Sequence, residues 1–507
     1  MKLFQSILGF LGLTGLHLPA EPKIPDLSSP SVPLNHPATV QFTAWLAAFN
    51  TGDRKTFLDY HSGSGFPYSV ASRDIGDINR EWGLARASGG FHIAEVESNS
   101  EPSTIVVILK EKNRAQYARS SMIVDISKPN YPVIEFDIHP IITPIKLIPK
   151  DDPRRGQYEK ALQPLTKSTR KAVVHNIFNV LREQYVEPDL VDDLISALES
   201  HVNNGDYDNI VESEQFAKRL TTDLHAAGHD KHMWILFIEP RGGRPDRDDG
   251  PSEPPKHLED LRRINFGFES ISLDKDTMPG KTIATLPITG FVPSEERFAS
   301  DWKEIRAEIG KVLSTVANAD ALLIDLRNNH GGSPDTVAFI LSYLLDNGPI
   351  HILDFVDRNG KVEEVFSTLP IDELPAGTHA FGGTKPLFVL TTNETVSGGE
   401  EMAYDLQAFK RSGAVIGEGN KATAGSANQI TQPRFICEDI FGKGWWFVVV
   451  PSVKPVHSIT GTNWQRVGVA SDVVAGSGEW KGVNDALEVG KQLAKLALQT
   501  GEPQQEL

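Results

Sequence analysis

The sequence predicts an α/β core that follows a helical domain and a small α+β domain. Three patterns occur in order: one helical segment followed by four strand-like runs, then amphipathic helical periodicity, then alternating strands and helices from about residue 264. We therefore expect an N-terminal α+β domain over residues 21–147, a helical domain over 158–240 and an α/β core over 257–500.

Composition and charge limit the classes of function. The chain has 507 residues, which is enough for about three domains. Its 50 Lys and Arg against 67 Asp and Glu give a net charge of −17, so it lacks the basic footprint of a nucleic-acid-binding protein. A hydrophobic content of 39% excludes general disorder. Because Cys437 is the only cysteine, an intrachain disulfide framework and a thiolate zinc cluster are excluded.

The first twenty residues resemble a secretory signal peptide. Lys2 is followed by a largely apolar run over residues 3–16, and Ala20 precedes a stretch rich in Pro and Ser. We expect residues 1–20 to be a signal peptide and the protein to be secreted or extracellular; the alternative is a tail without a targeting role. No other run approaches the length of about 18 apolar residues that a membrane-spanning helix needs.

The α+β domain is predicted from one helix and four strands. Phe42, Trp45 and Phe49 recur at helical spacing within residues 39–50, and Gly52 follows as a stop signal. The four strand-like runs are 91–97, 104–110, 119–126 and 133–138. This pattern is similar to that of small domains of the cystatin or NTF2 type.

The helical domain and the α/β core are predicted from hydrophobic periodicity. Helical spacing covers residues 166–203 and 213–227, and segment 241–256, rich in Gly, Pro and charge, is typical of a loop. The strand-like runs of the core are 266–272, 281–288, 320–326, 386–391 and 413–417, with a β-rich section at 445–457. Helical patterns lie at 294–317, 334–345, 398–410 and 483–499.

A serine stands at a predicted strand-to-helix junction. The apolar run 386–391 is followed by Ser397, Gly398 and Gly399, and then by an amphipathic helix. A serine hydroxyl here is lifted off the sheet at the positive end of the helix dipole, and the Gly398 N–H can donate to a developing oxyanion. The alternative is an ordinary helix cap, in which Ser397 forms a capping box with Glu400. Spacing alone does not separate the two interpretations.

Two glycines follow another buried strand. The run 320–326 leads into a turn that contains His330, Gly331 and Gly332. Consecutive glycine amides after a strand can form an anion-binding nest, and His330 is itself a candidate base. The alternative is an ordinary strand–turn–helix connection that has Pro334 at the start of the helix.

Three histidines, His225, His229 and His232, come just before an apolar run. Their spacings would suit a metal site if all three lay on one helix. Gly228 and Asp230 end that helix before His232, which favours a positioned general base in an Asp-x-His turn. The alternative is a histidine with a surface or core role only.

Taken in this order, these segments resemble the tail-specific and tricorn-type serine peptidase family, in particular its branch that includes interphotoreceptor retinoid-binding protein. The resemblance covers roughly residues 160–490. The motifs that carry it are Asp230-Lys231-His232, IDLRNNHGGSP at 324–334, SGGEEMAYDLQ at 397–407 and TGTNWQRVGV at 460–469.

The resemblance implies a core of the crotonase/ClpP-like ββα type behind the helical domain. The site residues that it implies are Ser397 as nucleophile, His232 as general base, Gln465 as the third catalytic position, and the Gly398, Gly331 and Gly332 amides as oxyanion donors. Residues 414–418 carry no lysine, which favours a Ser–His over a Ser–Lys mechanism.

The predicted function is hydrolysis of peptide bonds through an acyl-enzyme, with a peptide or protein as substrate and no cofactor or metal. The branch usually has a glutamate where this chain has Gln465, and a neutral amide cannot stabilise an imidazolium by charge. The alternative is a non-catalytic module that binds a hydrophobic small molecule, such as a retinoid or fatty acid, on the same fold. A metal-dependent hydrolase that uses the three histidines is a third hypothesis. Substrate preference and oligomeric state stay open.

Overall fold

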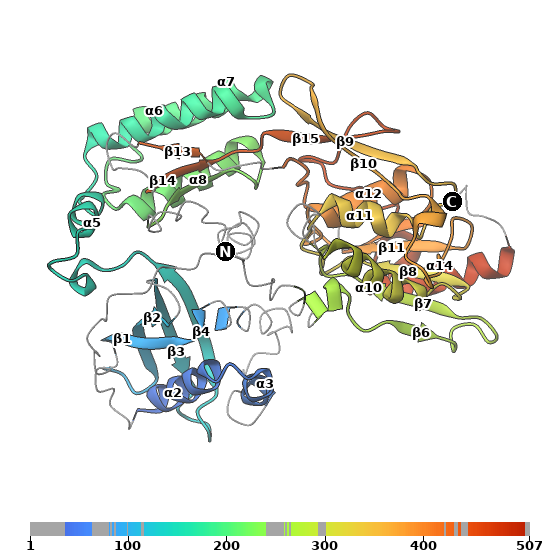
Figure 1. Cartoon of the computed structure of the whole chain (residues 1–507), viewed down its shortest axis with the longest axis horizontal. Coiled ribbons are helices and arrows are strands. Elements are labelled where there is room, and N and C mark those ends of the chain that lie inside the picture. The colour runs from blue at the N-terminus through green and yellow to red at the C-terminus, as the bar shows by residue number, and fades with distance from the viewer. Residues whose placement is uncertain are drawn as a thin grey trace. The chain divides into compact units, whose positions relative to one another are not determined.

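A computed structural model describes most of the chain (Figure 1). The described residues are 36–62, 81, 84–85, 88–98, 100–112, 116–239, 258, 261–262, 265–292, 301–419, 422–429, 434–437 and 445–501. The predicted signal peptide, residues 1–20, and the predicted loop 241–256 lie outside them. The described residues form two compact units: one contains the chain up to Gln163 together with Ile238 and Glu239, and the other contains Pro164–Phe237 and the chain from residue 258 onward.

The first unit is an antiparallel sheet with a helix packed on it. The strands pair in chain order: β1 (Phe91–Ser98), β2 (Thr104–Glu111), β3 (Tyr117–Val124) and β4 (Val133–Ile141). Helix α2 (Pro37–Asn50) buries Phe42, Trp45 and Phe49 in the hydrophobic core beside the sheet. These elements confirm the predicted helix and the predicted four strands. The described part of this unit also contains α3 (Arg54–Ser62), η1 (Ile145–Leu147) and α5 (Arg155–Ala161).

The second unit begins with helices that lead to a small sheet. The helices are α6 (Lys167–Gln184), η2 (Pro188–Leu190), α7 (Val191–Asn204) and α8 (Ser213–Gly228). Strand β5 (Trp234–Phe237) follows α8 and pairs with β14 (Trp446–Val449), which pairs in turn with β13 (Arg434–Ile436). The end of α8 is therefore held beside a segment from the C-terminal part of the chain.

A six-stranded sheet forms the core of the second unit. Its order is β16-β12-β11-β8-β7-β6, and all neighbours are parallel except β6 with β7. The strands are β6 (Ser272–Asp274), β7 (Ile283–Pro287), β8 (Ala321–Asp325), β11 (Leu387–Thr391), β12 (Ala414–Glu418) and β16 (Val473–Ala475). The predicted strand 266–272 is wrong in its bounds, because η3 (Asn265–Gly267) starts with positive φ angles of 47° at Asn265 and 56° at Phe266.

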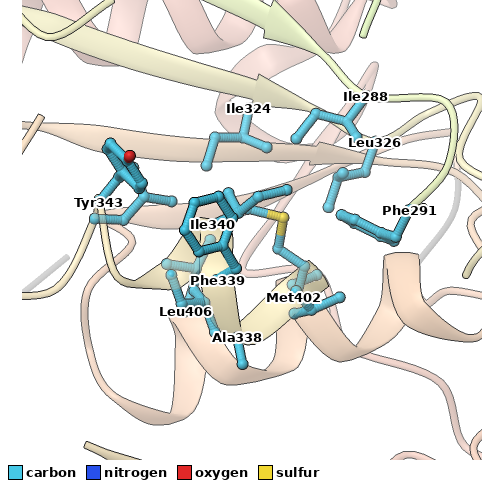
Figure 2. Packing of buried hydrophobic residues seen from close by; sticks show 14 of the residues in the cluster. Ile288, Phe291, Ile324, Leu326, Ala338, Phe339, Ile340, Tyr343, Met402 and Leu406 are labelled. Atoms are coloured by element: carbon cyan, nitrogen blue, oxygen red, sulfur yellow. The ribbon is translucent and has the colours of Figure 1, made fainter. Parts of the chain in front are cut away.

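Helices cover both faces of this sheet. Leu322 and Ile324 lie in the cluster that includes α10 (Trp302–Ser314), α11 (Pro334–Leu341) and α12 (Gly398–Ala408). Leu323 lies in the cluster that includes α14 (Ala486–Thr500) on the other face. This explains why the strands are almost continuously apolar. Figure 2 shows Ile324 and Leu326 facing Met402 and Leu406 of α12.

A third sheet and short helices complete the described part of this unit. The sheet pairs β10 (Val362–Ser367), β9 (His351–Asp357) and β15 (Val453–His457) in antiparallel fashion. The short helices are η5 (Ile371–Glu373) and η6 (Gly478–Trp480). Within the described residues, no helix has both the length and the apolar character needed to cross a membrane.

Candidate active site

The candidate site lies where two neighbouring parallel strands end. The turn 326–333 follows β8 and segment 392–397 follows β11, and these two strands pair directly. The carboxyl ends of parallel strands meet at one edge of a sheet, where α/β proteins place their sites. Thr395 Oγ1 donates to the Leu326 carbonyl at 2.8 Å, which ties the two segments together.

Ser397 has a strained backbone at the start of α12. Its φ of 57° and ψ of −121° match the first central position of a type II′ turn, where glycine is favoured. An ordinary helix N-cap has extended φ and ψ instead. The Ser397 N–H donates to Glu400 Oε2 at 3.0 Å, as in a capping box. Ser397 therefore occupies the predicted capping position, but in a conformation that capping does not require.

The glycine turn packs directly against this serine. Gly331 and Gly332 have φ angles of 87° and 140°. A Cβ atom on Gly331 would lie 2.8 Å from the Cβ of Ser397, and one on Gly398 would lie 3.0 Å from the Gly332 carbonyl oxygen. The contact between the turn and the start of α12 therefore requires glycine on both sides.

The amides of this turn differ in their partners. The Gly331 N–H donates to Asn329 Oδ1 at 2.8 Å, and Asn329 Nδ2 donates to the Ile288 carbonyl at 2.9 Å. The N–H groups of Gly332 and Gly398 donate to no other residue in the part of the chain that the structure describes. These two amides are therefore free to bind a ligand oxygen, whereas the Gly331 amide is occupied.

Glu400 joins the serine to a second loop. Its carboxylate is fully buried and accepts four hydrogen bonds. The donors are Ser397 N at 3.0 Å, Thr423 Oγ1 at 2.6 Å, Gly425 N at 2.6 Å and Ser426 N at 2.8 Å. Burial raises the pKa of the Glu400 carboxyl, and these hydrogen bonds oppose that rise. Glu400 thus fixes the Ser397 backbone and the loop at the same time.

His232 lies in a turn between α8 and β5. Helix α8 ends at Gly228, and His229 follows in the left-handed conformation with a φ of 48°. Asp230 Oδ1 accepts a hydrogen bond from His232 N at 3.0 Å and lies 3.2 Å from His232 Nδ1. The Asp230 side chain is fully buried, whereas the His232 side chain is 13% exposed. The predicted end of the helix before His232 is confirmed.

Gln465 contacts backbone rather than the histidine. Its Oε1 accepts hydrogen bonds from Ala427 N at 2.7 Å and Asn428 N at 2.9 Å. Within the described residues, no hydrogen bond joins Gln465 to His232, and the buried Gln465 Nε2 has no partner. The role of Gln465 in this structure is to hold the 427–428 backbone.

The loop over residues 423–428 connects the serine and histidine elements. At one end it donates to Glu400, and at the other Asn428 Nδ2 donates to Asp230 Oδ2 at 3.1 Å. Within the described part of the chain, no hydrogen bond joins Ser397 directly to His232. The two predicted residues are linked through Glu400, this loop and Asp230.

The other candidate histidines have different surroundings. His225 Nε2 is 2.6 Å from the Met233 carbonyl oxygen, and His229 is exposed at the end of α8. His330 is exposed in the glycine turn. Among the described residues, no group of three His, Cys, Asp or Glu side chains could hold a metal ion. The described residues give the three-histidine metal hypothesis no support.

The buried face of α12 carries two further carboxyls, Glu401 and Asp405. Burial raises the pKa of both well above the usual range, and the charge of Asp405 adds to the rise at Glu401. His457 Nε2 lies 3.5 Å from Asp405 Oδ1, and burial, with the nearby His351, lowers the pKa of His457 to about 4. The helix that follows Ser397 therefore buries acidic groups that favour their neutral forms.

The raised pKa values of these carboxyls predict how the stability of the protein depends on pH. A carboxyl whose pKa is raised in the folded state contributes to the free energy of unfolding. This contribution is fully present below the pKa of the unfolded chain, about 4, and is lost as the pH rises. Asp405→Asn removes this loss, so the variant should gain stability relative to the wild type between about pH 5 and pH 8. Urea unfolding of both proteins at the two pH values measures the gain. A stability difference that does not change with pH would contradict the prediction.

Comparison with known proteins identifies the family. Residues 282–474 match the model of peptidase family S41, and residues 159–265 match the N-terminal domain of this peptidase in eukaryotic IRBP. The chain carries a peptidase family S41 domain. The S41 chain is also similar to a tail-specific protease of Haemophilus influenzae, with 24% identity over 265 residues. That match covers 52% of the chain and 33% of the relative, so the chain spans about a third of the relative's length.

Solved structures give weaker similarities to this S41 chain. The photosystem II D1 C-terminal processing protease is 14% identical with a TM-score of 0.34, over 61% of this chain and 93% of that one. The tricorn protease is 12% identical with a TM-score of 0.33, over 80% of this chain and 41% of that one. The family resemblance inferred from the sequence motifs is confirmed by the S41 match, as is an α/β peptidase-type core with an N-terminal domain.

Three residues that organise the site were not among the predicted site residues. Asp230 was predicted only as part of a turn, Asn329 as part of a glycine-rich connection, and Glu400 as a helix-capping residue. Their positions were the available signal. Asp230 and Asn329 lie one or two residues from a predicted functional residue, and Glu400 lies in the first turn of the helix. Their contacts depend on segments far away in the chain, which spacing does not reveal.

Proposed function

We propose that this chain is a serine peptidase that hydrolyses peptide or protein substrates through an acyl-enzyme on Ser397. The observation that carries the proposal is the strained backbone of Ser397, held against the glycine turn at the carboxyl edge of the sheet. Strained non-glycine residues cluster at functional sites, because the surrounding structure must compensate for the strain. The family match supports the same class of reaction.

The proposed oxyanion donors are the amides of Gly332 and Gly398. Both N–H groups are without partners among the described residues and lie beside Ser397. Donors aimed at the developing negative charge lower the barrier for attack on a carbonyl. Gly331, also predicted as a donor, instead provides the close approach between the turn and the serine.

The proposed mechanism uses His232 as general base. His232 Nε2 takes the hydroxyl proton as Ser397 Oγ attacks the carbonyl carbon of the scissile bond. Collapse of the tetrahedral intermediate breaks the carbon–nitrogen bond, and His232 returns the proton to the leaving amine. Water then attacks the acyl-enzyme by the same route and restores Ser397. Proton transfer requires His232 to come within hydrogen-bond reach of Ser397, directly or through one water molecule.

Three finer assignments belong to the same proposal. We assign the six-stranded core to the crotonase/ClpP-like ββα type and the first unit to the cystatin or NTF2 type. We also propose that the protein is secreted, on the strength of the signal-like residues 1–20. Fusion of residues 1–40 to a reporter without its own signal tests this, because export of the reporter is expected only if the leader functions.

Hydrolysis of a peptide library tests the proposed function. Mass spectrometry should detect new N-termini with the wild type and none above background with Ser397→Ala. Ser477→Ala, in a surface turn, is the control and should cleave like the wild type. Cleavage by Ser397→Ala would contradict the proposal. Absence of cleavage by folded wild type, together with retinoid or fatty-acid binding that Ser397→Ala leaves unchanged, would favour the alternative of a binding module.

Gly331→Ala should inactivate the enzyme by displacing the nucleophile. The added methyl group would lie 2.8 Å from Ser397 Cβ, so the serine or the turn must move. A misplacement of about 1 Å can lower the rate by about 10²-fold. Gly360→Ala is a matched control, because Gly360 has a similar φ of 80° but no atom within 4 Å of the added Cβ. Equal peptidase activity in the two variants would contradict the proposed contact.

A further inference from the structure

We propose that Asp230, and not Gln465, is the acidic partner of His232. In this assignment Asp230 is a positioning residue that keeps the proton on His232 Nδ1 and leaves Nε2 free to accept the Ser397 proton. The inference rests on the proposed serine peptidase function. It places the negative charge of the site on Asp230. The related branch carries a glutamate at a different position, the one that Gln465 occupies here.

The surroundings of Asp230 fit this role. The carboxylate is fully buried, and Oδ1 faces both His232 N at 3.0 Å and His232 Nδ1 at 3.2 Å. Its other oxygen accepts from Tyr185 Oη at 3.2 Å and Asn428 Nδ2 at 3.1 Å. The groups around the carboxylate can all donate, so the two oxygens are fixed in direction by partners on three different segments.

The charge of Asp230 follows from the same contacts. Burial alone would raise its pKa, but the hydrogen bonds and the electrostatic attraction of His232, together with the hydrogen bond from Asn428, outweigh burial, and the pKa lies below the usual range. An ionised carboxylate has no proton to donate, so the contact with His232 requires the proton on Nδ1. The lone pair of the imidazole is then on Nε2, the nitrogen that a general base must present.

Gln465 cannot take this role from its present position. Its carbonyl oxygen is bound to the Ala427 and Asn428 amides, and within the described residues it makes no hydrogen bond to His232. Gln465 instead holds the backbone of Asn428, whose side chain in turn supports Asp230. A neutral residue here places no further carboxylate against the Asn428 backbone, and so avoids repulsion with the buried negative charge of Asp230.

The test is the rate at which a fluorophosphonate labels Ser397 in the full chain. Asp230→Asn should slow labelling by about 10³- to 10⁴-fold, since the same acid-to-amide change in another serine protease lowers turnover about 10⁴-fold through the wrong histidine tautomer. Adding Gln465→Glu to Asp230→Asn should not restore the rate, because residue 465 is held by backbone amides. Asp230→Glu should recover part of the rate.

Asp223→Asn is the matched control. Asp223 is also buried, lies seven residues earlier on α8, and accepts a hydrogen bond from Tyr207 Oη at 2.8 Å, but among the described residues no hydrogen bond or ion pair joins it to His232. This variant should lose stability to a similar degree and label at the wild-type rate. Circular dichroism and thermal unfolding of each variant separate loss of folding from loss of function.

A second measurement addresses the histidine directly. Nitrogen-15 shifts of His232 in the wild type, assigned with His232→Gln, should report a proton on Nδ1, and Asp230→Asn should move it to Nε2. A wild-type Nε2–H tautomer, wild-type labelling by Asp230→Asn, or recovery in the double variant would each overturn the assignment. If the wild type is not labelled, the proposed function fails, and the tautomer alone decides whether Asp230 is the partner of His232.

Discussion

Ser397→Gly should stabilise the protein by about 1 kcal/mol and abolish peptide hydrolysis. Glycine adopts a φ of 57° with a ψ of −121° without steric strain, whereas serine does not. Loss of the nucleophile should lower turnover on the order of 10⁶-fold, as in another serine protease. Urea unfolding measures the first effect, and a peptide-cleavage assay measures the second.

Ser397→Ala is the control that separates the two effects. Alanine removes the hydroxyl but keeps the Cβ atom, so this variant should be equally inactive without the gain in stability. A Ser397→Gly variant that is less stable than Ser397→Ala would mean that the serine backbone stores no strain. A stabilised variant that still cleaves peptides would mean that Ser397 is not the nucleophile.

Glu400→Gln should destabilise the protein by about 3 kcal/mol and lower its activity. Each carboxylate oxygen accepts two hydrogen bonds, so replacing either oxygen by an amide NH₂ group breaks two of them and sets donor against donor. Because one of the four donors is the Ser397 amide, the nucleophile and the loop over residues 423–428 should loosen together. Thermal unfolding and the labelling rate at Ser397 measure the two consequences.

Glu401→Gln is the matched control for this change. Glu401 is the next residue of α12 and is also buried, but burial raises its pKa well above the usual range. Its neutral form resembles glutamine in size and charge, so the substitution should change stability by less than about 0.5 kcal/mol at neutral pH. Equal losses in the two variants would contradict a specific role of the Glu400 network.

The sequence predicted the core of the fold where strands are buried on both faces. Runs such as 320–326 and 386–391 are almost wholly apolar and lie in the centre of the six-stranded sheet. Strands β9 and β10 were not predicted, because β10 exposes five of its six residues and carries two glutamates. Its pairing with β9 depends on tertiary contacts rather than on a hydrophobic pattern.

The candidate site could be predicted only in part, for a similar reason. Ser397, Gly332 and Gly398 lie in or just after the connections that follow two buried strands, where sequence patterns are informative. The contact of Asp230 with Asn428, and that of Gln465 with the same loop, join segments that are distant in the chain. The sequence therefore named only part of the site, and it did not reveal which residues of the site contact one another.

Covalent labelling is the most direct test of the central claim that Ser397 is an activated nucleophile. The full chain is treated with a fluorophosphonate, digested, and mapped by mass spectrometry. The predicted result is one adduct, on the peptide that contains Ser397, which disappears in Ser397→Ala and in His232→Ala. Absence of any adduct on the folded wild type, or an adduct on another serine that survives Ser397→Ala, would contradict the claim.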